Sequence, residues 1–357
     1  MDKNPGSYEI IKKNISFKSP GRIGLDTKTF SNEFYDVIHV DTQADPAFKP
    51  KKASVVWRNY PNVLPPNTVS EDEWGSIWKS NDIGGVGTVV QSPLKIDDID
   101  SFKTPDPFAE GRFGPLMEMV PIAEFDSKYL ILDYAAPLFE RMHFLLGFEN
   151  LMMSLLAETK KIKLLAEKLT DFMCGLIENA YKSTGNKLDG IYLQDDLGTQ
   201  QGLLMSLSVF KDIFKPGYKK IFEAAHKHGM DVWLHSDGKI HPFLEHLIEI
   251  GLDVFNIQQP DLMGIDEIAS LIKGKVAIHC TADIQDTMHK TPKDVAGQVR
   301  KLIDKWNTEK GGFIAYDYGD PETIGIPEKN RKTSFEAFME FGGVNRQVGR
   351  KSRLNGA

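Results

Sequence analysis

Two short apolar runs in the middle of the chain each end in side chains that could do chemistry. Asp195 and Asp196 follow the first run, and His235 and Asp237 follow the second. If both runs are neighbouring strands of a parallel sheet, their carboxyl ends meet at one edge, and these four side chains share one pocket. Carboxylates and an imidazole are suited to acid–base catalysis or to holding a cation.

The spacing of His235 and Asp237 leaves three interpretations open. Residues i and i+2 at a strand end point to the same side, so an imidazole nitrogen and a carboxylate oxygen could chelate one divalent cation such as zinc. The same pair could instead act as acid and base or bind substrate. In the structural interpretation, Asp237 caps the following helix and His235 forms a hydrogen bond inside the fold.

The adjacent carboxylates of Asp195 and Asp196 could have different roles. One would turn into the pocket while the other fixes the loop through Thr199 or backbone amides. Carboxylates held close together raise the pKa of one partner, which would suit a general acid. A pair that only caps the loop is the alternative.

The elements that must position these residues alternate from residue 129 onward. Strands are predicted over 129–132, 190–193, 231–234, 253–256, 275–278 and 312–315, and helices over 137–157, 160–183, 207–228, 241–250, 265–272, 292–307 and 328–340. With a further strand over 36–40, this pattern predicts an α/β chain that folds as a (β/α)8 TIM barrel. A doubly wound open sheet is the alternative, but no Gly-rich phosphate loop follows these strands.

The chain is expected to divide into three parts. Residues 1–125 form an irregular N-terminal extension with small strands, near 54–57 and 87–90, that packs on the barrel and gives its first strand. Residues 126–345 form the main barrel body. Residues 346–357 form a basic tail.

Further polar side chains follow the later predicted strands. Candidate substrate-binding residues are Gln200, Gln259, Asp283, Tyr316 and Tyr318. The two tyrosines alternate around Asp317, so either that aspartate or the tyrosine pair faces the pocket. Cys280 is either a small core residue or a weaker candidate for a thiolate metal ligand.

Composition excludes several classes of function. The chain of 357 residues is 41% hydrophobic and carries a net charge of −7, so it offers no electrostatic case for binding nucleic acid or an anionic membrane. No run reaches the roughly 18 apolar residues of a membrane helix. With two cysteines, a disulfide framework is not indicated, and a cytoplasmic enzyme acting on a small molecule is expected. Aromatic segments in residues 1–125 could form a homodimer contact.

Several segments together resemble the uroporphyrinogen decarboxylase superfamily, and more closely its branch of corrinoid-dependent methyltransferases. The resemblance is strongest over 128–342 and implies a (β/α)8 barrel with its pocket at the strand ends. The segments that carry it are Asp195–Gln200, His235–Gly238, Gly251–Asn256, Ala282–Gln285 and 312–330.

The resemblance also implies a metal site that differs from the one in the methyltransferases. Those enzymes hold zinc with a His-x-Cys pair and a later cysteine, where this chain has His235, Asp237 and, near the last strand, Tyr318. An oxygen-rich site should activate a thiol less well than one built from thiolates. We therefore expect methyl transfer between a small methylated or methoxylated compound, or a methyl-corrinoid protein, and another acceptor.

Two alternative functions stay open at this stage. One is a decarboxylase or lyase acting on a small substrate, with Asp195 or Asp237 stabilising a developing cation. The haem-pathway decarboxylases grip propionates with an Arg-rich amino-terminal segment, which the surroundings of Arg22 do not reproduce. The other alternative is a module that binds a corrinoid or tetrapyrrole with little catalysis of its own.

Overall fold

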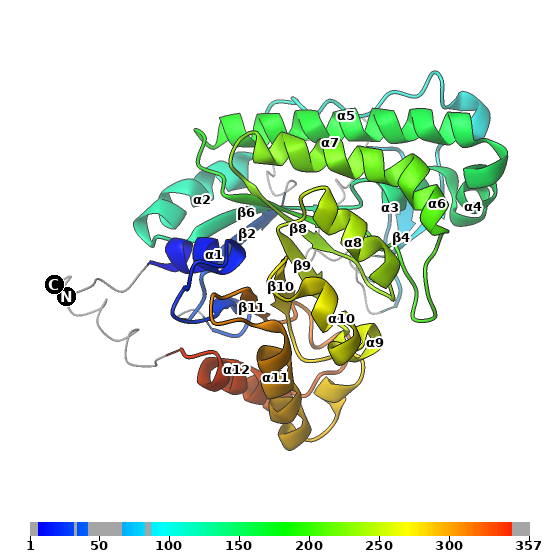
Figure 1. Ribbon diagram of the computed structural model, residues 1–357. Helices are drawn as coiled ribbons and strands as arrows, with labels where there is room; N and C mark the ends of the chain where they lie inside the picture. Colours follow the sequence, from blue (N-terminus) through cyan, green and yellow to red (C-terminus); the bar gives the residue numbers. More distant parts are fainter. Residues whose placement is uncertain (1–5, 32–33, 42–65, 83–86, 345–357) are drawn as a thin grey trace.

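Eight parallel strands roll into one nearly closed barrel, as the sequence predicts (Figure 1). The computed structural model describes residues 6–31, 34–41, 66–82 and 87–344. The order of the strands in the barrel sheet is β1-β11-β10-β9-β8-β7-β6-β2. The strands are β1 Gly24–Asp26, β2 Val37–Asp41, β6 Tyr129–Ala135, β7 Gly190–Gln194, β8 Asp231–His235, β9 Val254–Ile257, β10 Ala277–Cys280 and β11 Phe313–Tyr316.

Helices surround the barrel, and α5 and α7 lie side by side along it (Figure 1). The predicted helix over 137–157 is divided in two, because Gly147 with φ of 82° ends α3 and begins α4. No helix in the described ranges is both long and apolar enough to cross a membrane. The helices are α1 Ser7–Ile15, α2 Gly114–Phe125, α3 Phe139–Leu146, α4 Phe148–Ala157, α5 Thr159–Ser183, α6 Leu207–Val209, α7 Lys215–His226, α8 His241–Glu249, α9 Pro260–Met263, α10 Ile265–Ile272, α11 Pro292–Trp306 and α12 Glu328–Phe341, with a π-helical turn over Phe210–Phe214 and short 3-10 turns over Ile96–Asp98 and Thr287–His289.

Side chains alternate between two apolar layers along each strand. One layer fills the barrel interior and includes Tyr129, Trp233 and Ile314, together with Ile11 and Ile15 of α1. The other layer lies between the strands and the surrounding helices. Because every strand is covered on both faces, the strands read in the sequence as short apolar runs.

The segment before residue 125 supplies two barrel strands, β1 and β2, where the sequence predicts one. It also forms a small antiparallel sheet of β3 Val69–Glu71, β4 Ile77–Lys79 and β5 Thr88–Gln91, and β5 matches the predicted strand over 87–90. The strand predicted over 54–57 and the basic tail lie outside the described residues.

Buried ion pairs connect this small sheet to the barrel. The Asp72 carboxylate accepts hydrogen bonds from the N–H groups of Trp74 and Ser76 and lies 3.4 Å from Arg141 of α3. Arg112 donates two hydrogen bonds to Glu73, at 2.9 and 2.8 Å. Each charge is buried with a partner, which avoids the large cost of an uncompensated buried ion.

The barrel closes between β1 and β2, the two ends of the strand order, and side chains do much of the closing. The Asp36 N–H donates to the Leu25 carbonyl at 2.7 Å, and the Asp36 carboxylate accepts from the Leu25 N–H at 2.9 Å. Arg22 holds the same carboxylate with two hydrogen bonds, at 2.6 and 2.8 Å. A carboxylate thus stands where a strand carbonyl would accept in a regular ladder.

Further along β2, the partly exposed side chain of His39 lies between two carboxylates from the strands on either side. Its Nε2 is 2.8 Å from Asp26 Oδ2 of β1, and its Nδ1 is 2.7 Å from Asp133 Oδ1 of β6. Burial disfavours the charged ring, but Asp133 and Asp26 outweigh burial and raise the pKa of His39 well above its ordinary value of 6.5. His39 is therefore an imidazolium that joins three strands at the point of closure.

We predict that His39 makes the protein less stable as the pH becomes alkaline. The pKa of His39 is higher in the folded than in the unfolded chain, so its contribution to stability is fully present below the ordinary pKa of 6.5. That contribution is lost as the pH rises through the pKa of the folded state. Urea unfolding at a series of pH values should show this loss in the wild type, whereas His39→Gln should be less stable at neutral pH and lack it.

His226→Gln provides the matched control. His226 also pairs with an aspartate, Asp253, but its side chain is 37% exposed, so solvent screens the pair and the slope should change little. Equal pH slopes for the wild type and His39→Gln would contradict the prediction.

Candidate metal centre

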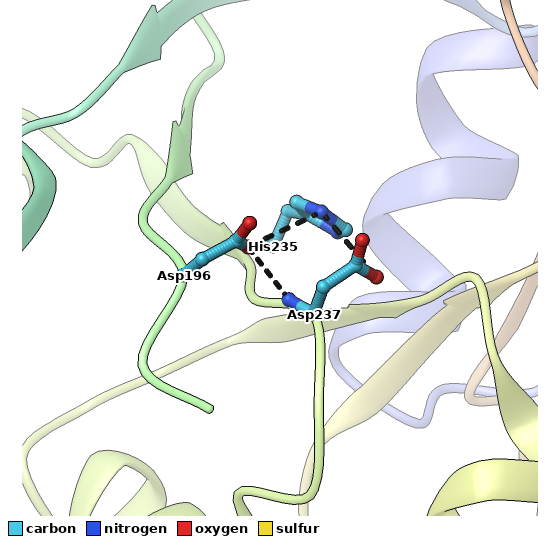
Figure 2. Close-up of side chains that lie close together, drawn as sticks. All are labelled: Asp196, His235 and Asp237. Carbon is cyan, nitrogen blue, oxygen red and sulfur yellow. Dashed lines mark hydrogen bonds and ion pairs between the residues drawn. The ribbon is translucent and has the colours of Figure 1, made fainter. Parts of the chain in front are cut away.

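Asp196, His235 and Asp237 converge at the carboxyl ends of β7 and β8 (Figure 2). The His235 Nε2 lies 3.8 Å from Asp196 Oδ1 and 3.9 Å from Asp237 Oδ1. Within the described part of the chain, one ligand atom from each residue lies within 4.8 Å of the others. The structure therefore brings together three of the four residues predicted to be catalytic.

Strand register and two locked loops place these side chains. Gln194 of β7 pairs with His235 of β8, so the two strands end at the same height. Beyond the strands, the Asp237 N–H donates to Asp196 Oδ1 at 2.8 Å, and the Leu197 N–H donates to the Ser236 hydroxyl at 2.9 Å. Each loop thus donates a backbone N–H to a side-chain oxygen of the other, which fixes the carboxylates relative to the imidazole.

Gly238 permits the close approach of these loops. Its φ is 87°, in the left-handed region, and a Cβ built on it would lie 2.4 Å from the carbonyl carbon of Gly198. A larger residue at 238 would therefore push the loop after β8 away from the loop after β7.

The donor set fits a divalent cation. Distances of 3.8 and 3.9 Å are too long for hydrogen bonds. They are shorter than two metal–ligand bonds of about 2.1 Å laid end to end, so one cation can reach both ligand atoms of each pair. One imidazole nitrogen and two carboxylate oxygens suit zinc or a slightly harder divalent ion.

The charges around Asp237 favour a cation as well. Burial raises the pKa of the Asp237 carboxyl group, His235 lowers it, and the carboxylates of Asp196 and Asp283 raise it further. Negative charges that repel one another in this way are stabilised when a cation lies between them.

Asp195 points away from the cluster and caps α3. Its fully buried carboxylate accepts hydrogen bonds from the N–H groups of Leu138, Phe139 and Glu140, and from the Tyr218 hydroxyl at 2.6 Å. Burial raises its pKa to about 6, while these donors act in the opposite direction. The adjacent aspartates thus differ in role, and the cap is made through backbone amides at the beginning of a helix.

The other predicted pocket residues have different surroundings. Gln200 is exposed and donates to Gln285 at 2.6 Å. Gln259 is 5% exposed, and among the described residues its Oε1 has no hydrogen-bond partner, so it is available to a ligand. The Asp283 carboxylate accepts from the N–H groups of Asp261, Gln285 and Asp286 and so shapes the loop after β10.

Cys280 lies apart from the cluster. It belongs to the apolar layer between the strands and the helices, because His279, one residue earlier, points into the barrel. Burial raises the pKa of the Cys280 thiol well above its ordinary value, and the thiol donates to the Thr281 carbonyl. These surroundings are those of a core residue.

Tyr316 faces the barrel interior, Tyr318 lies within electrostatic reach of Asp237, and Asp317 faces outward. The Tyr316 ring packs on His279 with 4.6 Å between ring centroids. Burial and the neighbouring charge of Asp237 raise the pKa of Tyr318. Asp317 instead accepts two hydrogen bonds from Arg331 of α12.

Two residues near the cluster had no role assigned from the sequence. Glu140, the second residue of α3, accepts a hydrogen bond from the Asp196 N–H, and its pKa is raised well above the ordinary value by burial and by Asp196 and Asp195. Asn256 of β9 places its Oδ1 2.7 Å from His235 Nδ1. Two sequence signals point to Asn256: it belongs to one of the segments that carry the family resemblance, and it lies two residues after Val254, which lines the barrel interior.

The sequence model of the uroporphyrinogen decarboxylase family matches residues 80–320. The chain belongs to this family. Comparison with curated protein sequences gives no match.

Solved structures of similar fold include a methyltransferase from Methanosarcina mazei, with a TM-score of 0.55 and 15% sequence identity, over 71% of this chain and 72% of that chain. A B12-independent methionine synthase from a Shewanella species matches with a TM-score of 0.44 and 11% identity, over 82% of this chain and 74% of that chain. At these identities the likeness to the methyltransferase concerns the fold.

We predict that the two adjacent aspartates separate stability from metal binding. Asp195→Asn turns an amide nitrogen toward backbone N–H donors and should lower the free energy of unfolding by about 2–3 kcal/mol, with little effect on Zn²⁺ affinity. Asp196→Asn should do the reverse, because it removes a ligand from a partly exposed position. Urea unfolding and Zn²⁺ titration of both variants test this, and a stable Asp195→Asn with lost Zn²⁺ binding would contradict it.

We also predict that Gly238→Ala costs more than its backbone conformation alone explains. Gly229, with φ of 73° and open space around its Cα, is the matched control, and Gly229→Ala should lower stability by about 1 kcal/mol. Gly238→Ala should lower it by about 3 kcal/mol or more and weaken Zn²⁺ binding, because the two loops must separate. Equal losses of stability in thermal unfolding would show that the close approach is unimportant.

Proposed function

We propose that this protein transfers a methyl group between a small methylated or methoxylated compound, or a methyl-corrinoid protein, and an acceptor. In this proposal Asp196, His235 and Asp237 hold a divalent cation such as zinc. The observation that carries it is the convergence of these three ligand atoms, within 4.8 Å of one another, at the carboxyl ends of β7 and β8. That is the face on which barrel enzymes place their active sites.

The cation, when bound, would polarise the acceptor and lower the pKa of its acidic proton. In the transfer, a lone pair of the acceptor forms a bond to the methyl carbon. The bond between that carbon and its donor breaks, and its electron pair stays with the donor. The proton of the acceptor passes to a carboxylate oxygen of the cluster. Gln259, with its unpartnered buried oxygen, is proposed to orient the substrate.

The electrostatics of the cluster support this substrate class over a polycarboxylate. The titratable groups that act on Asp237 are His235, Asp196 and Asp283, and Glu140 lies beside Asp196. Binding several carboxylates calls for Arg or Lys partners, which form the strong charge-assisted hydrogen bonds. A neutral or cationic methylated compound suits the acidic cluster better than a porphyrinogen does.

We predict that the purified protein binds about one Zn²⁺ and that binding requires the cluster. His235→Gln and Asp196→Asn should each bind Zn²⁺ at least about tenfold more weakly in competition titrations. Asp212→Asn is the matched control, since Asp212 is an exposed aspartate that pairs with Lys163 and is not a member of the cluster.

The reaction itself can be tested with methylcobalamin as the methyl donor and small thiols, phenols and amines as acceptors. Loss of the methyl–cobalt absorbance should require Zn²⁺ and His235. The proposal would be wrong if the purified wild-type protein held no divalent metal and if the His235→Gln variant demethylated methylcobalamin at the wild-type rate. Release of carbon dioxide from a small carboxylate, with no methyl donor present, would point to a decarboxylase instead.

A further inference from the structure

A chain of hydrogen-bonded side chains crosses the barrel interior and ends at the candidate metal centre. His235 Nδ1 is 2.7 Å from Asn256 Oδ1, and Asn256 Nδ2 is 2.9 Å from His279 Nδ1. From there the chain continues through His279 Nε2 to Asp26 Oδ2 at 2.9 Å. Asp26 is also hydrogen-bonded to His39, and His39 is hydrogen-bonded to Asp133.

The orientation of the Asn256 amide is fixed by a backbone carbonyl. Asn256 Nδ2 also lies 3.1 Å from the carbonyl oxygen of His279, which can only accept a hydrogen bond. The amide nitrogen must therefore face His279, and the amide oxygen must face His235. Because that oxygen can only accept, the proton between them belongs to His235 Nδ1.

The two other histidines in this series of hydrogen bonds, His279 and His39, agree with this assignment. His279 Nδ1 receives the Asn256 N–H, so its proton lies on Nε2 and is donated to Asp26. Burial lowers the pKa of His279, consistent with a neutral ring. Asp26 accepts from both His279 and His39, and His39 donates from both of its ring nitrogens. With the Asn256 amide oriented in this way, the contacts assign one proton to His235 Nδ1 and one to His279 Nε2.

We infer that Asn256 is a positioning residue that holds His235 as the Nδ1–H tautomer, with the Nε2 lone pair directed at Asp196 and Asp237. A lone pair on Nε2 is what a metal ligand must present, and partners of the other ring nitrogen orient ligating histidines in metal sites generally. The importance of this for metal binding rests on the proposed function, whereas the tautomer does not.

The decisive measurement is long-range ¹H–¹⁵N NMR of the metal-free protein with ¹⁵N-labelled histidine, at about pH 9, above the usual range of histidine titration. The His235 signals, assigned by their loss in His235→Gln, should show a protonated Nδ1 and an unprotonated Nε2. A proton on Nε2 instead would overturn the inference.

Two variants separate positioning from folding. Asn256→Leu removes the acceptor, so His235 should lose the Nδ1–H preference, and Zn²⁺ should bind about 10- to 100-fold more weakly. Asn256→Asp keeps an acceptor for Nδ1–H but turns a carboxylate oxygen toward the His279 carbonyl. It should lose stability yet keep both the tautomer and the Zn²⁺ affinity, and an unchanged tautomer in a folded Asn256→Leu would contradict the inference.

Asn330→Leu is the matched control. Asn330 is also a buried asparagine, but its amide donates to the carbonyls of Met288 and Lys290 and makes no hydrogen bond to the cluster. It should leave the His235 spectrum and Zn²⁺ affinity unchanged. Failure of the proposed function has a different signature: a protein with the Nδ1–H tautomer that moves no methyl group would retain the inference and lose the function.

Discussion

The structure depends on one partly buried imidazolium, His39, held between Asp26 and Asp133. These three residues come from β2, β1 and β6, so the bridge stands where the first two strands of the chain must meet to close the barrel. A charge in this partly buried position is stabilised because each ring N–H meets a carboxylate oxygen. The same Asp26 oxygen also accepts from His279, and closure of the barrel and order at its mouth are therefore one interaction network.

Aromatic rings make this polar layer rigid. Tyr192, Trp233 and Tyr316 pack around the His279 ring, with centroid distances of 5.9, 5.1 and 4.6 Å. They limit access of water, and hydrogen bonds in such low-dielectric surroundings are stronger than in solvent.

The carboxyl groups of Asp26 and Asp133 differ in the net shift of their pKa, although both contact His39. Burial raises the pKa of both, and for Asp26 the bonds with His39 and His279 reverse the effect.

Local patterns were enough to predict the barrel and the strands that carry the cluster, because apolar runs and polar strand ends are properties of neighbouring residues. They were not enough for β1, a three-residue strand with no apolar alternation. Nor could they distinguish Asp195 from Asp196, since the answer depends on α3 beginning beside one of them. The Asp26–His279 contact joins residues 253 positions apart, and only the closed barrel brings them together.

Helix α1 gives the barrel a floor. Ile11 and Ile15 pack among the interior side chains, and Lys12 grips Asp231 at the first residue of β8. These contacts cover the amino-terminal end of the barrel, opposite the strand ends that carry the candidate metal centre. Nine residues that supply none of the candidate ligands thus shield the barrel interior beneath those ligands from solvent at its other end. Deuterium uptake of the interior would register a loosened α1 before any change in the ligands themselves.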